Sequence, residues 1–260
     1  MTEVGAEAGA EAVAEAVAEV NEQVDIRRAW LDEDEVGLSA ARVAKRRLVE
    51  EVRRLVDVVF QMDCGDVGYG EGGDGDGDGD GERAARFMAM AAEVGALADR
   101  VGELPRIPRA EVDGANVSQA RRQDALLVER STINGRGNPL APPVRMWADG
   151  DLIRAEAYFN APYEGPPGRV HGAWVAACFD EVLGCAQGAS GAFGFTGTLT
   201  ITLRRATPLY TKISYEAGFS HREGRKIHAW GRCYANGQLT AEASGVFVVP
   251  VFGGVGHGAV

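Results

Sequence analysis

The sequence is poor in the patterns that mark secreted, membrane-spanning and metal-binding proteins. Its 260 residues include four cysteines, with no Cys-x-x-Cys pair, and four histidines, so neither a disulfide framework nor a zinc cluster is expected. The first 25 residues carry seven acidic residues and no basic one, which is unlike a secretory signal. No run of 18 apolar residues occurs, so no membrane span is expected. These absences predict a cytoplasmic protein with reduced thiols.

Short motifs of several other enzyme classes are also missing. The chain has no His-Glu-x-x-His motif and no P-loop lysine. Its nearest approach to Gly-x-Ser-x-Gly, at residues 188–192, lacks the final glycine. Zinc peptidase, P-loop and serine hydrolase chemistry are therefore not predicted.

The formal net charge of −11 is concentrated in two segments. Residues 1–25 and 63–82 hold 15 of the 38 acidic residues and no basic one, so the rest of the chain has a net charge of +4. Residues 1–103 carry a net charge of −14, which is the wrong sign for contacts with nucleic-acid phosphates. Residues 104–260 carry +3, so the total charge says little about what this part binds.

Two amphipathic helices are predicted within residues 38–103. Apolar residues recur there at intervals of three and four, and two such helices joined by a loop are typical of an antiparallel hairpin. The joining loop at 63–82 is rich in Gly and Asp and is not expected to order itself. The acidic, Ala-rich residues 1–37 are expected to be disordered or a frayed helix. The apolar positions are Leu48, Val52, Leu55 and Val59 in the first helix, and Phe87, Met90, Val94, Leu97 and Val101 in the second.

Three local motifs in this half favour plain structural interpretations. The basic patch at 45–47 is followed by Glu50 and Glu51, which indicates a solvated helix face. Glycines at 68, 70 and 73 match the dinucleotide fingerprint, but no strand is predicted before them. The Asp-Gly run at 74–80 lacks the spaced Glu of an EF-hand, so an acidic linker is favoured over a divalent-ion site.

The second half of the chain predicts an α+β fold. One long helix precedes several alternating strands separated by Gly turns, which is typical of a sheet wrapped on a central helix. The last four strands are predicted to form an antiparallel meander. The expected parts are an extended Pro-containing arm at 104–143, a domain at 144–252 and a flexible tail at 253–260. Within the domain, strands are expected at 145–159 (with a turn at 148–150), 196–203, 212–220, 226–234 and 239–249, and the helix at 171–187.

The start of the long helix carries the residues that best suit chemistry. His171 and Gly172 open the helix, where unpaired backbone N–H groups can bind a developing oxyanion. Asp180 and Glu181 follow in a segment that is otherwise apolar and small, and a buried carboxylate needs a partner. The residues alone leave open that these acids face solvent or pair with arginine, and that His171 merely caps the helix.

This region resembles a known family. Glu164-Gly-Pro-Pro-Gly-Arg-Val-His-Gly-Ala173, followed by Asp180 and by a Thr-rich strand from Thr196, is similar to the PaaI-like hotdog-fold acyl-CoA thioesterases. The resemblance covers about residues 138–250, and residues 1–130 lie outside it. It implies a hotdog fold, an antiparallel sheet around a long central helix, to which the N-terminal hairpin is an extension. It also implies a homodimer, or a tetramer built from dimers, with each active site at a dimer interface.

The resemblance implies a role for each matching residue. The Gly172 N–H would polarise the thioester carbonyl, and His171 would orient the loop or touch that carbonyl. Asp180 of a second copy would be the general base or the nucleophile, and Thr196 would hold the water or the Asp carboxylate. The residues expected to bind substrate are Ala173, Glu181, Arg204, Arg205, Arg225 and Lys226.

Two positions depart from the family pattern. Ala173 replaces the second glycine of the motif and Trp174 follows it, which would narrow the acyl or pantetheine channel. Gly165 stands where some relatives have Asn, so that contact would be missing.

The expected function is hydrolysis of acyl-CoA thioesters to free acid and CoA, without a cofactor or metal ion. Arginines near the expected site suit the phosphates of CoA. A non-catalytic hotdog protein that binds acyl-CoA is the alternative; a hotdog dehydratase or a DNA-binding regulator fits the residues less well. Acyl chain length, and CoA against acyl carrier protein as the carrier, remain open.

Overall fold

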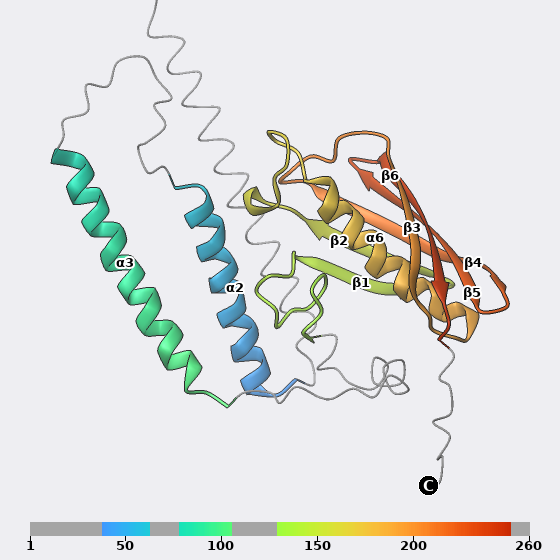
Figure 1. The fold of residues 1–260 in the computed structure, drawn as a ribbon, viewed down its shortest axis with the longest axis horizontal. Coiled ribbons are helices and arrows are strands. Elements are labelled where there is room, and N and C mark those ends of the chain that lie inside the picture. Colours follow the sequence, from blue (N-terminus) through green and yellow to red (C-terminus); the bar gives the residue numbers. More distant parts are fainter. Residues whose placement is uncertain (1–37, 63–77, 106–128, 251–260) are drawn as a thin grey trace, which may run out of the picture. The chain divides into compact units, whose positions relative to one another are not determined.

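The computed structural model describes residues 38–62, 78–105 and 129–250 (Figure 1). The chain divides into two compact units, Met1–Asp57 together with Gly114–Val260, and Val58–Asp113. Both tails, the dinucleotide-like motif, Cys64 and the first part of the Asp-Gly run lie outside the described residues. In the described ranges no helix combines the length and apolar character that a membrane crossing needs.

Both predicted N-terminal helices are present. α2 spans Ala40–Phe60 and α3 spans Asp78–Gly102, as their apolar spacing indicates. The helix α3 begins inside the Asp-Gly run, so it takes in the last five residues of the loop predicted at 63–82. Acidic residues are favourable near the positive end of a helix dipole, which explains an early start. The pairing of α2 with α3 in a hairpin stays a prediction.

Six antiparallel strands form one sheet in the order β1-β2-β4-β5-β6-β3. This sheet, with one long helix against it, confirms the predicted α+β hotdog fold. The strands are β1 (Val144–Asp149), β2 (Leu152–Tyr158), β3 (Phe195–Leu203), β4 (Lys212–Glu223), β5 (Lys226–Ala235) and β6 (Gln238–Val248). The helix is α6 (Gly172–Ala186), and two short 3-10 helices, η2 (Ala161–Tyr163) and η3 (Gln187–Ser190), lie on either side of it in sequence.

The predicted four-strand meander is wrong in one respect, the place of β3. Strands β4, β5 and β6 follow one another through tight turns, but β3 pairs with β6 at the edge of the sheet. The link from β3 to β4, residues 204–211, contains Pro208 and is longer than the loops that close a hairpin. β3 therefore carries its free edge outwards in the part of the chain that the structure describes.

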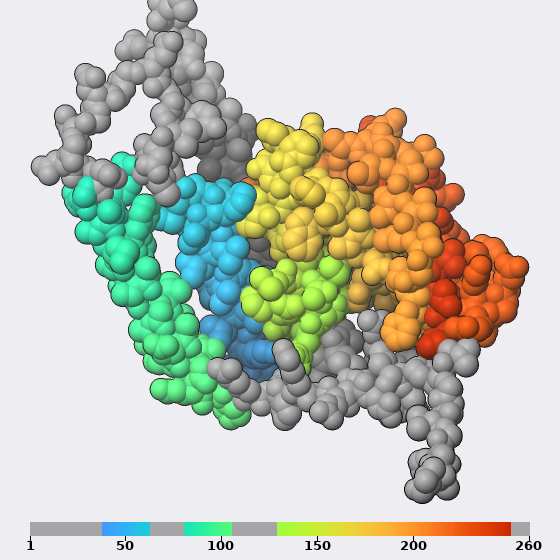
Figure 2. All heavy atoms as spheres, viewed as in Figure 1, coloured from blue at the N-terminus to red at the C-terminus, as the bar shows by residue number. Residues whose placement is uncertain are grey.

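Helix α6 packs on one face of the sheet and forms the centre of the core (Figure 1). Phe179 is fully buried and meets Tyr215 of β4 edge-on, with 5.3 Å between ring centroids. Gly231 of β5 allows this approach, because a Cβ there would lie 3.2 Å from the Phe179 ring. Burying a side chain of this size contributes about 2 kcal/mol. The sheet and α6, coloured yellow-green to red in Figure 2, form one continuous body on the face shown.

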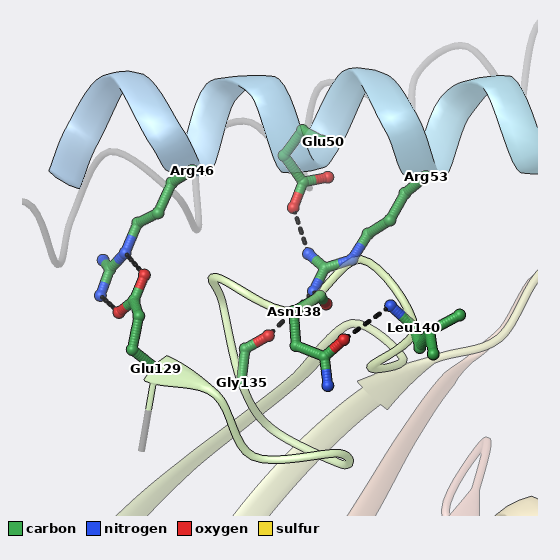
Figure 3. Close-up of polar contacts among 7 residues, drawn as sticks. All are labelled: Arg46, Glu50, Arg53, Glu129, Gly135, Asn138 and Leu140. Carbon is green, nitrogen blue, oxygen red and sulfur yellow. Dashed lines mark hydrogen bonds and ion pairs between the residues drawn. The ribbon is translucent and has the colours of Figure 1, made fainter. Parts of the chain in front are cut away.

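Helix α2 contacts the arm that precedes β1 through arginine side chains. Arg46 donates two hydrogen bonds to Glu129, at 2.9 and 2.6 Å (Figure 3). The predicted solvated face at 45–47 is thus corrected, because Arg46 is only 8% exposed. Glu129 is 83 residues away in sequence, so a local pattern cannot reveal the charge that compensates Arg46.

Arg53, two turns further along α2, holds the next part of the arm. Its Nη2 donates to the carbonyl oxygens of Gly135 and Asn138, at 3.0 and 2.8 Å, and its Nη1 donates to Glu50 (Figure 3). The described part of the arm, residues 129–143, is a series of turns rather than the extended chain that its prolines suggested. Charged hydrogen bonds to backbone carbonyls therefore join α2 to the domain that contains the sheet.

Candidate active site

His171 is the N-cap of α6 and holds the preceding loop. Its Nδ1 accepts a hydrogen bond from the Ala173 N–H at 3.1 Å, and its own backbone N–H donates to the Tyr163 carbonyl at 2.9 Å. An accepting Nδ1 leaves the proton of a neutral imidazole on Nε2. Of the roles open in the sequence, this geometry matches capping and orienting the loop. The exposed ring still presents its Nε2–H as a hydrogen-bond donor.

Gly172 begins the helix and presents a backbone donor. Among the residues that the structure describes, its N–H has no hydrogen-bond acceptor, whereas the next N–H, of Ala173, is occupied by His171. A Cβ at position 172 would lie 3.1 Å from Leu203 of β3, so glycine lets the helix start come close to the end of that strand. The free N–H at the positive end of the helix dipole is suited to an oxyanion.

Gly165 packs directly against His171. A Cβ at position 165 would lie 2.9 Å from the Cα of His171 and 3.3 Å from its ring, so no larger residue fits without moving the loop. From the sequence alone, Gly165 indicates only that a contact made by an Asn in some relatives is missing. In the structure its small size is what allows the histidine to reach its capping position.

Asp180 lies two turns further along α6 and is bonded to Thr196 at the start of β3. The Thr196 hydroxyl donates to Asp180 Oδ1 at 2.8 Å. Both side chains are exposed in the single chain, so the cost of burial that made Asp180 notable in the sequence does not arise within one copy. The threonine fixes one carboxylate oxygen and leaves the other for a second partner.

Asp180 and Gly172 are separated by eight positions on one helix. At a rise of about 1.5 Å per residue, their backbones lie about 12 Å apart along the axis. A carboxylate and an oxyanion donor that act on one thioester must both come within about 3 Å of the reacting groups. Within a single chain, the backbones of these two residues are therefore too far apart for both groups to act on one thioester.

Ala173 and Trp174 occupy the first turn of α6 beside an aromatic cluster. Trp174 meets Tyr163 edge-on, with 5.0 Å between ring centroids, and Tyr163 meets Phe159 in the same way at 5.5 Å. Trp174 is half-buried, whereas Ala173 is exposed. The tryptophan thus packs on η2 and helps to fix the loop.

Glu181 points towards the arm. The Ser131 hydroxyl lies 3.4 Å from its Oε1, and successive residues on a helix are rotated by about 100°, so Glu181 and Asp180 face different ways. Sequence reasoning missed Ser131, because a serine 50 positions away carries no local signal of this contact. The role of Glu181 in substrate binding stays a prediction.

The four expected basic residues fall at two ends of the sheet. Arg204 is ion-paired with Glu242, whereas Arg205 lines a cleft close to the start of α6. Arg225 donates to the Val249 carbonyl at 2.8 Å, and Lys226 pairs with Val248 at the end of β6 that also pairs with Phe195. The first pair is therefore near Gly172, and the second near Thr196 and Asp180.

Neither a metal cluster nor the two core thiols offer a competing centre in the described ranges. No three His, Cys, Asp or Glu side chains converge there to hold a metal ion. Burial raises the pKa of the Cys178 thiol, and it raises the pKa of Cys233 to about 11. Neither core thiol is a ready nucleophile at neutral pH, because the thiolate is the reactive form.

The comparison with known proteins agrees with this fold. No family model matches the chain. A crystal structure described as a thioesterase superfamily protein matches 78% of this chain and 94% of its own, with 26% identity and a TM-score of 0.61. The matched 78% of the chain contains more residues than the range 129–250, so the likeness extends into the N-terminal part.

Two further solved structures each match 41% of the chain. One is a Streptococcus mutans protein bound to acetyl CoA, with 14% identity, a TM-score of 0.39 and 88% of its own length covered. The other is a mutant of the phenylacetic acid degradation protein PaaI from Thermus thermophilus, with 16% identity, a TM-score of 0.38 and 93% covered. The conclusion on fold rests on the first of the three structures, to which the chain is similar over most of its length.

Proposed function

We propose that the protein hydrolyses acyl-CoA thioesters at a site made by two copies of the chain. The observation that carries this proposal is the 2.8 Å hydrogen bond from Thr196 to Asp180 of α6, the helix whose first N–H, that of Gly172, has no acceptor among the described residues. A carboxylate held by a hydroxyl and a helix N-terminus are the two parts that thioester hydrolysis needs. Since one chain holds them about 12 Å apart, each site takes one part from each copy.

The reaction follows from these two parts. The thioester carbonyl oxygen accepts a hydrogen bond from Gly172, which stabilises the negative charge of the tetrahedral intermediate. Asp180 of a second copy either removes a proton from the attacking water or attacks the carbonyl carbon itself, and an anhydride is then hydrolysed. In both routes the C–S bond breaks, the sulfur leaves as the CoA thiol after protonation, and water supplies the oxygen of the free acid.

The edge of β3 is the surface proposed to join the two copies. It is a nine-residue edge strand with large apolar residues exposed at both ends, Phe195 at 57% and Leu203 at 56%. Exposed edges of this length pair readily with another strand. Antiparallel pairing of β3 with its own copy would bring the Thr196 end of one chain beside the Leu203 end of the other, by two-fold symmetry. Asp180 of one copy would then approach Gly172 of the other.

The test is complementation between two inactive variants. Asp180→Asn removes the base, and Gly172→Pro removes the N–H donor; each alone is expected to lower kcat for release of CoA thiol at least ~100-fold. Co-expressed with different tags, the two variants form mixed dimers with one intact site, and about half of the wild-type activity per mixed dimer is expected. Inactive mixed dimers would overturn the shared site. A wild-type protein that binds acyl-CoA without releasing thiol would overturn hydrolysis and select the non-catalytic alternative.

A further inference from the structure

A cleft of about 260 Å³ opens where the loop before α6 meets the end of β3 and the β5–β6 turn. Backbone hydrogen bonds build it: the Val170 N–H donates to the Thr207 carbonyl at 2.9 Å, and Arg169 forms a bridge with Pro208. The third wall is the turn at Asn236, whose φ of +50° is left-handed. The residues that line the cleft are Arg169, Arg205, Ala206, Pro208, Ala235, Asn236, Gln238 and Thr240.

The charge in this cleft is positive and uncompensated within the described residues. The side chain of Arg169 donates only to the carbonyl of its neighbour Gly168, and Arg205 makes no side-chain hydrogen bond or ion pair among the described residues. No acidic residue is among those that line the cleft. Two guanidinium groups beside the amides of Asn236 and Gln238 supply several N–H donors in one place, a set that suits phosphate oxygens.

Three other arginines of the domain are committed to other contacts. Arg204 is bound to Glu242, and Arg232 lies within 4 Å of both Glu216 and Glu242. Arg225 donates to a backbone carbonyl at the far end of the sheet. Arg169 and Arg205 are thus a pair distinguished by the fold from these other arginines of the domain.

The two chain segments that approach each other at the proposed oxyanion donor also contribute residues to the cleft. Arg169 precedes His171 by two residues, so their Cα atoms are at most about 7 Å apart. On the other wall, Arg205 follows Leu203 by two residues, and Leu203 contacts the Gly172 position. A carrier that runs from a thioester at Gly172 towards this cleft would pass both arginines.

The geometry points to this cleft as the site that binds a phosphate group of the thioester's carrier, with Arg169 and Arg205 as the phosphate ligands. The identity of the carrier rests on the proposed function. The binding of a phosphate group is inferred from the residues that line the cleft. Coenzyme A and the phosphopantetheine of an acyl carrier protein both supply such a phosphate. The arginines bind the carrier and take no part in breaking the C–S bond.

The test compares three substrates with one acyl group and carriers of decreasing length. Acyl-CoA carries the nucleotide and pantetheine phosphates, acyl-4′-phosphopantetheine carries one phosphate, and the acyl-N-acetylcysteamine thioester carries none. Arg169→Gln and Arg205→Gln are each expected to raise KM for acyl-CoA about tenfold with kcat unchanged. Neither should change KM for the N-acetylcysteamine thioester by more than about twofold. Arg54→Gln is the matched control, because it removes the same charge from an exposed site on α2 that is paired with Glu51.

The outcomes separate the possible failures. If KM of the two cleft variants also rises for acyl-4′-phosphopantetheine, the result supports the cleft and assigns the pantetheine phosphate to it. If KM rises for acyl-CoA alone, the result supports the cleft and assigns the nucleotide phosphates to it. If Arg225→Gln raises KM for acyl-CoA and the two cleft variants do not, the phosphate binds at the β4–β5 turn and the inference is overturned. An equal rise in KM for the thioester without phosphate would overturn it as well, since the arginines would then act on loop structure.

A binding measurement makes the inference independent of turnover. Adenosine 3′,5′-bisphosphate is the probe for the nucleotide phosphates and phosphopantetheine the probe for the pantetheine phosphate, each titrated calorimetrically into the wild-type protein and the two variants. At least one probe is expected to bind, with a Kd about tenfold higher in each variant. Binding with this pattern and no thiol release would retain the cleft and overturn the proposed hydrolysis. Thiol release with no binding of either probe, and with KM unaffected in the variants, would overturn the cleft and retain the hydrolysis.

Discussion

Arg46 of α2 and Glu129 of the arm form a buried, two-bond ion pair. The Nε–Oε1 and Nη2–Oε2 distances are 2.9 and 2.6 Å, and the two residues are 8% and 4% exposed. Parallel bonds of this kind fix orientation as well as distance. The contact joins α2 to the segment whose Ser131 reaches Glu181, the neighbour of Asp180. The N-terminal helix is thus bonded to the domain that carries the candidate site.

Breaking this pair is expected to destabilise the protein strongly. Arg46→Ala leaves the Glu129 carboxylate buried without its partner, and the free energy of unfolding is expected to fall by about 3 kcal/mol. Arg46→Met combined with Glu129→Leu removes both charges, and is expected to lie within about 1 kcal/mol of the wild type. Urea denaturation followed by circular dichroism measures both. The exposed pair of Arg54 with Glu51 is the control, where Arg54→Ala should cost less than about 1 kcal/mol. Equal losses at the two sites would contradict a buried, structural pair.

The same pair predicts a dependence of stability on pH. Burial acts to raise the pKa of Glu129, but the hydrogen bonds and charge of Arg46, with Arg42 and Lys45 nearby, outweigh it and hold the pKa below 4.5. A carboxylate whose pKa is lowered by folding stabilises the native state above its unfolded pKa, and that contribution is lost as pH falls through the folded pKa. The difference in unfolding free energy between wild type and Glu129→Gln should therefore shrink as pH falls below about 4.5. Urea titrations of both proteins between about pH 7 and pH 3 measure it. A constant difference would show that the ionised carboxylate is not responsible.

The backbone donor at Gly172 can be removed without removing the helix. Proline is tolerated in the first position of a helix, and His171 has the φ of −62° and ψ of 132° that a residue before proline favours. Gly172→Pro is expected to lower kcat about 100-fold, as loss of an oxyanion donor does. Gly172→Ala adds a Cβ near Leu203 but keeps the N–H, so it separates the steric effect from loss of the donor. Similar activities for the two variants would mean that the Gly172 N–H does not bind the oxyanion.

The Thr196 hydroxyl is expected to matter through Asp180. Thr196→Val keeps a β-branched side chain in β3 but removes the donor to Asp180 Oδ1, and kcat/KM is expected to fall about tenfold. Thr198→Val is the matched control, being the same change at another exposed threonine of β3, and should retain activity within about twofold. Steady-state thiol release measures both variants, with their thermal stability checked in parallel. Equal effects at the two positions would assign the loss to the strand rather than to the carboxylate.

Much of the candidate site could be predicted from the sequence because its signals are local. The helix start at Gly172 follows from the loop and the small, apolar run behind it, and the alternation of Thr with Leu and Ile marks β3 as a strand. The reach of Thr196 to Asp180, 16 positions apart, came from a family resemblance rather than from periodicity. The exposure of Asp180 could not be predicted, because it depends on which distant segments of the chain pack around the end of α6.

The sequence by itself determined the element types, the turn at Asn236-Gly237 and the order of helix and strands, since side-chain periodicity and turn chemistry act over a few residues. Tertiary structure alone decided that β3 pairs with β6, that Arg46 of α2 pairs with Glu129, and that Arg169 and Arg205 line the same cleft. Each of these contacts joins segments between 36 and 83 positions apart. Such pairings are chosen by the balance of burial, charge compensation and strand pairing across the whole domain, and no short stretch of sequence contains that balance.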